Sequence, residues 1–263
     1  MSDDGSAGAY VNPGGEFRRD SNYITTRITA DGADGYPVEP GRYRLVVSRA
    51  CPWANRSIIV RRLLGLEPVL SMGIAGPTHD RRSWTFDLDP GGRDPVLGIE
   101  RLQEAFFARF PDYDRGITVP AIVDIPTGKV VTNDYPQITL DLSTEWRPFH
   151  RPGAPDLYPD DRRDEIDEVA ELVFRVAQEA VRNVAEHSAA GTVDVRLAAT
   201  DTVTLTVADD GIGFDPATLA DTPAGGHVGL LLLKDLARTA GGRLEIDASP
   251  GRGTRLHLEV PAT

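Results

Sequence analysis

Two groups of residues in this chain have types and spacings that could carry chemistry, and they lie in different halves of the sequence. Cys51, the only cysteine, is followed directly by Pro52. Glu179 and Asn183 stand four residues apart, so on a helix their side chains share one face. The first group could carry thiol chemistry, and the second could bind a hard cation through oxygen atoms.

Cys51 is expected at the junction between a strand at 43–48 and the helix that follows it. Backbone N–H groups and the positive end of a helix favour the thiolate, which is the reactive form of a cysteine. Val119 and Pro120 precede another expected strand, and they resemble the cis-proline that borders the thiol site of thioredoxin-like folds. A lone cysteine is more often a small buried apolar residue. The strand–Cys-Pro–helix context nevertheless favours a reactive thiol.

Four short motifs in the second half follow one another in an order that could bind a nucleotide. A carboxylate–amide pair on a helix comes first, and a strand ending in an aspartate and a Gly turn comes second. A Gly-rich loop then opens a helix, where backbone N–H groups can cradle phosphates, and a Gly-X-Gly-Thr turn leads into the last strand. Each motif alone is usually a plain turn or a solvated helix face, but together they predict a nucleotide site. The residues concerned are Glu179, Asn183, Asp209, Gly211, Gly213, Gly226, Gly229 and Thr254.

The composition is typical of a globular protein with an acidic surface. The formal net charge of -12 and the pI near 4.9 argue against nucleic acid or an anionic membrane as a main partner. No apolar run approaches the ~18 residues of a membrane span, and the acidic, Gly-rich start does not resemble a secretory signal. A single cysteine excludes an internal disulfide and a Cys-rich metal site. We therefore predict a cytoplasmic protein.

The hydrophobic periodicity predicts an α/β chain with two domains. In the first domain the expected order is strand, helix, strand, insertion, hairpin and helix, which is that of a thioredoxin-like fold. The second is expected to be an α/β sandwich whose alternating sheet meets helices on one face and water on the other. The predicted boundaries are an irregular arm at 1–42, the first domain at 43–146, a Pro-rich linker at 147–163 and the second domain at 164–263.

Individual elements follow from the same patterns and from Gly and Pro positions. One helix is predicted to run unbroken through 164–187, with an apolar stripe along its whole length. Strands are expected at 43–48, 69–72, 118–124, 129–132, 192–197, 203–208, 243–247 and 255–260, with a short extended piece at 23–28. The other helices are expected at 55–64, 99–110, 136–143 and 229–240.

Several motifs of the first half occur together in one known family. They are Cys51-Pro52-Trp53-Ala54, Gly65-Leu66-Glu67, Trp84-Thr85-Phe86, Thr118-Val119-Pro120 and the acidic start of the 164–187 segment. With them, residues 10–169 resemble the glutathionyl-hydroquinone reductases, the Xi-class glutathione transferases. The resemblance implies that Cys51 attacks the glutathionyl sulfur of a glutathionyl-hydroquinone and that a second thiol then releases the enzyme. It also implies that Trp84, Val119 and Asp134 line the thiol-peptide site.

Two departures from this family bear on the substrate. The usual Glu-Ser pair that grips the γ-glutamyl end of glutathione is replaced by Asp134 and Tyr135. Another low-molecular-weight thiol is therefore an alternative to glutathione. The family's all-helical second half, which holds the quinone pocket and the dimer contacts, is absent, and only the start of its first helix remains at 164–169.

The four motifs of the second half occur in the same order in the gyrase, histidine-kinase and MutL ATPase superfamily, the Bergerat fold. Residues 170–262 are similar to it, and especially to sensor histidine kinases of the nitrate-sensor type. The resemblance implies that Asn183 ligates Mg²⁺, that Glu179 is an acid/base candidate and that Asp209 accepts a hydrogen bond from the adenine amino group. It further implies supporting positions: Gly213 and Thr254 beside the base, Gly226 and Gly229 at the phosphates, and an ATP lid at 215–228.

The kinase resemblance is incomplete, because the phosphoacceptor helix, the dimerisation hairpin and the first strand of the ATPase domain are absent. His187 is not a phosphoacceptor by its position at the helix end. The leading hypothesis is an ATP- and Mg²⁺-binding module that changes conformation with nucleotide or transfers phosphate to a response regulator or another phosphoacceptor protein. It ranks first because the second half keeps nearly all its binding motifs.

Two other hypotheses remain open. One is a transferase or reductase that uses glutathione or a related thiol through Cys51, takes a quinone–thiol conjugate as substrate, and keeps the C-terminal half as a regulatory or scaffold domain. The other is a recombined chain in which one half is only a scaffold.

Overall fold

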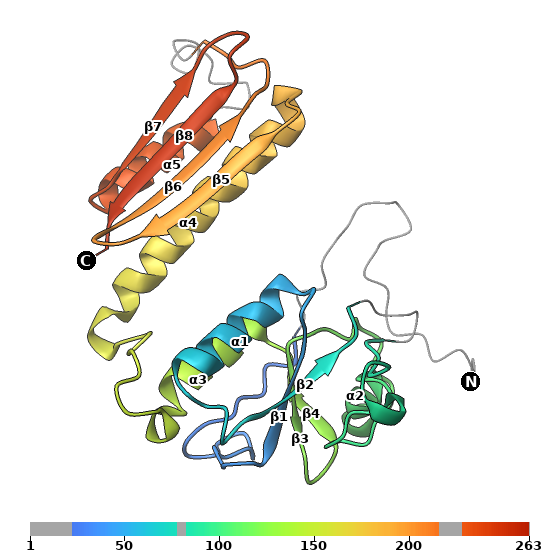
Figure 1. The fold of residues 1–263 in the computed structure, drawn as a ribbon. Helices are drawn as coiled ribbons and strands as arrows, with labels where there is room; N and C mark the ends of the chain where they lie inside the picture. Colours follow the sequence, from blue (N-terminus) through green and yellow to red (C-terminus); the bar gives the residue numbers. More distant parts are fainter. Residues whose placement is uncertain (1–22, 78–82, 216–227, 263) are drawn as a thin grey trace. The chain divides into compact units, whose positions relative to one another are not determined.

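The computed structural model describes residues 23–77, 83–215 and 228–262 (Figure 1). The chain divides into two compact units, Met1–Tyr158 and Pro159–Thr263. Each unit has its own hydrophobic core and its own sheet. No helix in the described part of the chain is long and apolar enough to cross a membrane.

The sheet of the first unit has four strands among the described residues, in the order β2-β1-β3-β4. β1 is parallel to β2 and antiparallel to β3, and β3 and β4 form an antiparallel hairpin. The fold is the mixed α/β, thioredoxin-like arrangement that the sequence predicts. The strand bounds are Tyr43–Ser48 for β1, Ser71–Ala75 for β2, Ala121–Asp124 for β3 and Lys129–Thr132 for β4.

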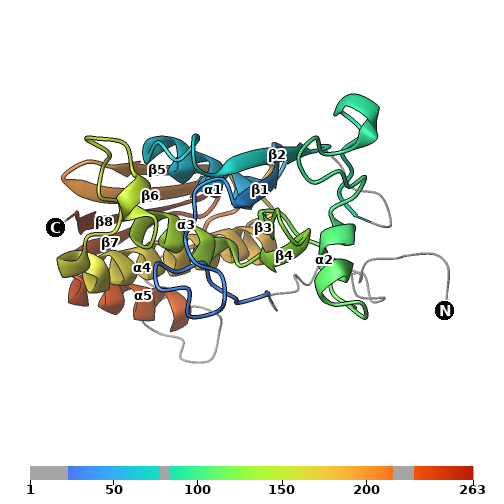
Figure 2. The same cartoon turned by 90° about the horizontal axis from the view of Figure 1, so that it is seen from below.

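Helices pack against this sheet on both sides. α1 and α3 lie side by side, and α2 packs against β4 away from them (Figures 1 and 2). The bounds are Pro52–Leu63 for α1, Gln103–Arg109 for α2 and Tyr135–Thr144 for α3, with short 3₁₀ turns at Pro90–Gly92 and Arg147–Phe149.

Two helices start at other residues than expected, each for a local reason. α1 starts at Pro52 rather than at residue 55, because the fixed φ of proline suits the first helical position. α2 starts at Gln103 rather than at residue 99. The segment before α2 is bonded to another part of the chain, because the Leu102 N–H donates to the Trp84 carbonyl at 3.0 Å.

Two strands also begin later than expected. β2 begins at Ser71 rather than at residue 69, because the Leu70 N–H is bonded to the Leu66 carbonyl at 2.9 Å in the turn after α1. β3 begins at Ala121 rather than at residue 118. Pro120 directly before it has no N–H for a ladder hydrogen bond.

A buried ion pair fixes the insertion between β2 and β3 to the sheet. Arg44 on β1 donates to Oδ2 of Asp94 through Nε at 2.9 Å and through an Nη at 2.7 Å. The other carboxylate oxygen accepts the N–H groups of Val96 and Leu97 at 2.9 and 2.8 Å. Gly73 on β2 leaves the space for this pair, because a Cβ there would lie 2.4 Å from Asp94 Oδ2.

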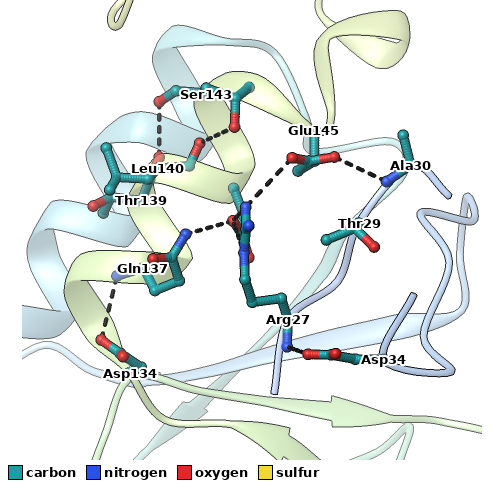
Figure 3. Close-up of polar contacts among 12 residues, drawn as sticks. Arg27, Thr29, Ala30, Asp34, Asp134, Gln137, Thr139, Leu140, Ser143 and Glu145 are labelled. Carbon is teal, nitrogen blue, oxygen red and sulfur yellow. Dashed lines mark hydrogen bonds and ion pairs between the residues drawn. The ribbon is translucent and has the colours of Figure 1, made fainter. Parts of the chain in front are cut away.

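The chain before β1, expected to be an irregular arm, is fastened to the first unit by side chains. Arg27 donates to Asp141 at 2.6 Å. It also donates to Glu145 at 3.3 Å, and the Ala30 N–H donates to Glu145 at 3.0 Å (Figure 3). The extended piece expected around Ile24 forms no strand. Instead, the Ile24 N–H donates to Oδ1 of Asn133, just after β4, at 2.7 Å. The Ile24 carbonyl accepts the hydroxyl of Thr132, the last residue of β4, at 2.7 Å.

The expectation of a linker without regular structure at 147–163 is corrected. A 3₁₀ turn at Arg147–Phe149 follows Trp146, whose side chain is fully buried in the core of the first unit. The Arg151 N–H then donates to the Leu64 carbonyl at 2.8 Å, which ties the segment to the end of α1. Packing against folded structure therefore gives regular turns to parts of a segment whose prolines predicted no regular structure.

The second unit has an antiparallel sheet whose four strands, within the described residues, follow the order β5-β6-β8-β7. α4 and α5 lie on one face of this sheet, which is the α/β sandwich that the sequence predicts (Figure 1). The strands are β5 at Val193–Ala199, β6 at Thr202–Asp209, β7 at Arg243–Ala248 and β8 at Thr254–Pro261. The helices are α4 at Arg163–Asn183, preceded by a 3₁₀ turn at Asp160–Arg162, and α5 at Val228–Thr239.

α4 is one continuous helix through the point where the two family resemblances meet. Leu172, Val176 and Ala180 form its buried stripe and join the core between the helices and the sheet. The predicted last turn is wrong, because the helix ends at Asn183 and a π turn follows at Val184–Ser188. Wider i→i+5 turns of this kind are frequent at functional sites.

One part of the sheet departs from the expectation that only one face meets water. All seven residues of β5 are exposed, on both faces of the strand. The neighbouring strand β6 buries Leu205 and Val207 under the helices. The helices therefore cover the middle of the sheet and leave its β5 edge open.

Candidate functional site

Cys51 lies at the N-cap of α1, between the end of β1 and Pro52, as the sequence predicts. Its side chain is largely buried, with 9% of the residue exposed, and Sγ donates to the Val119 carbonyl at 3.3 Å. The peptide bond between Val119 and Pro120 is cis. The tertiary structure thus brings together the two motifs, 68 residues apart, that predicted a thiol site.

The other residues predicted for the thiol site are positioned by hydrogen bonds. The Trp84 indole N–H donates to the Ile117 carbonyl at 3.1 Å, which holds the ring against the segment leading to Val119. Asp134 caps α3, because its Oδ1 accepts the Gln137 N–H at 3.3 Å. One oxygen of the carboxylate predicted to face a ligand is therefore already engaged at the helix terminus.

An aromatic cluster beside α1 was not predicted from the sequence. The ring of Tyr135, the first residue of α3, meets Trp53 at 6.3 Å and Tyr23 at 5.9 Å between centroids, both edge to face. The Arg56 guanidinium lies 5.8 Å from the centre of the same ring. Trp53 is two residues after Cys51, so the sequence alone shows that the two residues are close. Its contact with Tyr135 depends on the packing of α1 against α3.

In the second unit, Glu179 and Asn183 lie on the last turns of α4. Oε1 of Glu179 and Nδ2 of Asn183 are buried and have no hydrogen-bond partner within the described residues. The second oxygen of Glu179 pairs with Arg182 on the same helix. Buried polar atoms are normally bonded, so two unpartnered ones on one helix face indicate a site that takes a polar ligand.

The Gly turn after β6 lies at the end of α4. Asp209, the last residue of β6, pairs with Thr254 in the register of β6 and β8. Its Oδ1 accepts the Gly211 N–H at 2.8 Å, and the Ile212 N–H donates to the Ser188 carbonyl at 2.8 Å. The predicted base-contacting residues therefore stand where the π turn, the Gly turn and the start of β8 meet.

Close backbone contacts explain the glycines of this junction. A Cβ on Gly211 would lie 2.2 Å from the Ser188 carbonyl oxygen, and one on Gly253 would lie 2.0 Å from the Asp209 carbonyl oxygen. Gly213 and Gly253 also have positive φ angles of 59° and 73°. These glycines are needed for three turns to approach one another, whatever they contribute to a ligand.

A second carboxylate of the junction, Asp210, holds the loop after the π turn. It accepts the N–H groups of Gly191 and Thr192 at 2.8 and 2.9 Å and the Thr192 hydroxyl at 2.6 Å. These hydrogen bonds, led by that of the Thr192 hydroxyl, hold the pKa of Asp210 below its usual value. Sequence analysis singled out Asp209 but assigned no role to its neighbour.

The structure describes only some of the predicted phosphate-binding residues. Gly229 lies in the first turn of α5, whereas Gly226 and most of the predicted lid at 215–228 lie outside the described residues. Among the residues that are described, no group of three or more His, Cys, Asp or Glu side chains could hold a metal ion. Glu179 and Asn183 offer carboxylate and amide oxygens, which are ligand types that Mg²⁺ accepts together with phosphate oxygens.

Comparison with known proteins assigns each unit to a class. The family described as "Histidine kinase-, DNA gyrase B-, and HSP90-like ATPase" matches residues 168–263. The sensor histidine kinase NarS of Mycobacterium tuberculosis is 43% identical over 91 residues, which are 34% of this chain and 21% of that protein. The C-terminal part of the chain therefore carries a histidine-kinase-like ATPase domain.

The N-terminal part matches the Xi-class glutathione transferases. The glutathionyl-hydroquinone reductase YqjG of Escherichia coli is 34% identical over 178 residues, which cover 64% of this chain and 53% of YqjG. The crystal structure of a glutathione transferase from Gordonia bronchialis is 64% identical, with a TM-score of 0.58, and the match covers 65% of this chain and 52% of that one. The chain thus spans about half the length of these relatives and joins a part similar to them to an ATPase domain.

Proposed function

We propose that the C-terminal unit binds ATP with Mg²⁺ at the junction of α4, the Gly turn and the start of β8. The observation that carries this proposal is the pair of buried, unpartnered atoms on Glu179 and Asn183. The match of residues 168–263 to an ATPase family supports it. Bound Mg²⁺–ATP would supply a transferable phosphoryl group and a ligand-dependent change of conformation.

Each predicted residue has a role that its chemistry allows. The Asn183 amide would hold Mg²⁺ through its oxygen, and its N–H groups could donate to a phosphate. The Glu179 carboxylate accepts a proton or orients a water at the same place. Asp209 accepts a hydrogen bond from the exocyclic amine of adenine, and the Thr254 hydroxyl lies opposite it in the sheet register. Gly226 and Gly229 contribute backbone N–H groups to the phosphates.

We further propose that the partner of this module is a separate phosphoacceptor protein, such as a response regulator. The sensor histidine kinases that match this chain support a signalling role. No phosphoacceptor domain accompanies the ATPase domain in the described residues. In this proposal, a side chain of the phosphoacceptor protein receives the phosphoryl group of bound ATP.

Calorimetric titration of the full chain with ATP, with and without Mg²⁺, tests the proposal. A saturable heat is expected in the parent, and at least a tenfold weaker affinity is expected in Asn183→Ala, which loses a charge-assisted contact. Glu171→Ala is the matched control, because Glu171 is an exposed carboxylate on the same helix that pairs only with Arg175 among its described neighbours. A parent that gives no nucleotide heat would overturn the proposal.

A second function is favoured by a different observation, the contact of Cys51 Sγ with the Val119 carbonyl at the cis-proline. We propose that Cys51 forms a mixed disulfide with glutathione or a related thiol. The thiolate attacks the sulfur of a hydroquinone–thiol conjugate, the carbon–sulfur bond breaks with its electron pair on the ring carbon, and that carbon takes a proton to give the free hydroquinone. A second thiolate then attacks the mixed disulfide and restores the Cys51 thiolate.

Intact mass after exposure to oxidised glutathione tests this second function. The folded parent should gain one glutathionyl group, and Cys51→Ser should gain none. Denatured parent serves as the reference for an unprotected thiol. If the denatured chain forms the adduct and the folded chain does not, Cys51 is a buried structural residue instead.

A further inference from the structure

The β5 edge of the second unit has an apolar face that nothing in the described part of this unit covers. Register pairs Val195 with Val207 and Leu197 with Leu205, so all four side chains point to the same face of the sheet. On β6 these residues are buried under the helices. On β5, Val193, Val195 and Leu197 are 42%, 51% and 63% exposed. On this face of the sheet, the helices therefore cover the apolar residues of β6 but not those of β5.

The opposite edge of the same sheet shows that this is specific to β5. β7 packs against α5, and its inward-facing Leu244 and Ala248 are buried. β5 and β7 are both edge strands, and within the described residues β5 pairs with β6 alone. β5 contains no proline, lysine or bulge, three of the features that prevent an edge strand from pairing with another chain, and its two charged residues have opposite signs.

The sequence of β5 is complementary to itself in the antiparallel sense. If a second copy pairs with β5 about a two-fold axis at Val195, Val193 lies opposite Leu197 of the second copy. On the other face, Asp194 of each copy lies opposite Arg196 of the other copy, which gives two opposite-charge pairs. Within one chain these two charges already attract each other, with Arg196 Nε 2.7 Å from Asp194 Oδ1, and both are exposed. The same two charges are thus available to an opposing strand.

We propose that this chain forms a two-fold dimer in which β5 pairs antiparallel with β5 of a second copy. The paired edges join the two four-stranded sheets into one and place the apolar side chains of both copies against each other. A second copy fits this edge because one register satisfies the apolar face and the charged face at once. An unrelated strand would match the apolar face without matching the order of the two charges.

Charge reversal on the full-length chain tests the proposal, with the association state measured by sedimentation or light scattering over a concentration series. Asp194→Arg sets arginine against arginine across the axis, and Arg196→Asp sets aspartate against aspartate. Each variant should dissociate at a concentration at least tenfold higher than the parent. The double variant D194R/R196D restores both opposite-charge pairs and should recover the dimer.

Mixing the two single variants separates pairing between chains from local effects within one chain. A chain with Asp194→Arg presents two arginines to a chain with Arg196→Asp, which presents two aspartates. The mixture should therefore form a heterodimer, although neither variant associates strongly alone. Glu245→Arg, at the exposed edge of β7, is the matched control and should leave the dimer unchanged.

Three results would overturn the proposal. The first is a parent that stays monomeric across the series. The second is a dimer that both single variants leave intact. The third is a mixture of the single variants that fails to associate while circular dichroism shows both to be folded.

Discussion

Glu179 and Asn183 lie one helical turn apart on α4, and each has a buried side-chain atom without a hydrogen-bond partner among the described residues. An unmade hydrogen bond at a buried atom costs the folded state about 1–3 kcal/mol. The second unit therefore holds two polar groups at a cost in stability. A ligand that bonds to them recovers this free energy, which is why we place the nucleotide site here.

Asn183→Ala should raise the free energy of unfolding of the nucleotide-free chain while it weakens nucleotide binding. Removing an unpartnered amide and placing a better helix former should raise the free energy of unfolding by about 0.5–1 kcal/mol in the absence of nucleotide. Urea unfolding monitored by circular dichroism measures this. At one fixed Mg²⁺–ATP concentration well above the parent's Kd, the stabilisation by nucleotide should be smaller in the variant by about 1.4 kcal/mol or more, as a tenfold or weaker affinity requires. A variant that unfolds more easily than the parent would show that the amide is a structural residue.

Tyr135→Ser should increase the reactivity of Cys51 toward oxidised glutathione. The substitution returns a hydroxyl to the start of α3, where the transferase resemblance expects one, and removes the ring that packs on Trp53 and Tyr23. One hydrogen bond to a charged group is worth about 1.5–3 kcal/mol, so the rate of adduct formation at Cys51 should rise by roughly tenfold or more. Timed intact-mass measurements give this rate. Tyr135→Phe keeps the ring and should match the parent.

Asp94→Ala should strongly destabilise the first unit. It leaves the Arg44 guanidinium buried without its carboxylate, and breaking a buried pair in this way costs about 3–5 kcal/mol. Glu100→Ala removes the partner of Arg93 in an exposed pair and should cost less than about 1 kcal/mol. The two variants are compared by urea unfolding. Equal losses would contradict the assignment of Arg44 and Asp94 as a structural pair.

Asp141 should make the first unit relatively more stable in acid. Burial raises the pKa of this carboxyl above its usual value of 3.8, against the opposing hydrogen bonds from Arg27 and Gln137. The folded state then binds the proton more tightly than the unfolded state, so this group favours folding below 3.8 and loses that contribution as pH rises through the folded pKa. The stability advantage of the parent over Asp141→Asn should therefore be larger at pH 4 than at pH 7. Urea unfolding at both pH values measures the difference in free energy of unfolding between parent and variant. A difference that is smaller at pH 4 than at pH 7 would contradict the prediction.

Much of the fold follows from residues close together in the sequence. The apolar run at β1, the proline after Cys51 and the stripe on α4 each depend on neighbours within one element, so their periodicity predicted the elements. Proline and glycine positions placed most turns for the same reason. The order of the four nucleotide motifs also identified the class of the second unit, because each motif is a short local pattern.

Contacts between distant residues could not be predicted in this way. Arg44 and Asp94 are 50 residues apart, and Arg27 and Asp141 are 114 apart, so only the folded chain brings these charges together. The ordering of the expected linker likewise depends on the burial of Trp146 in a core built from the rest of the first unit.

The sequence by itself determined that Cys51 stands at a helix start and that Glu179 and Asn183 share a helix face, because chain geometry over a few residues is enough for both. Only the tertiary structure decided that Cys51 contacts Val119, that each of the two α4 side chains has one buried atom without a partner among the described residues, and that the apolar face of β5 is left open. Those properties depend on which elements pack together, and the free energy of packing belongs to the whole unit rather than to any one segment.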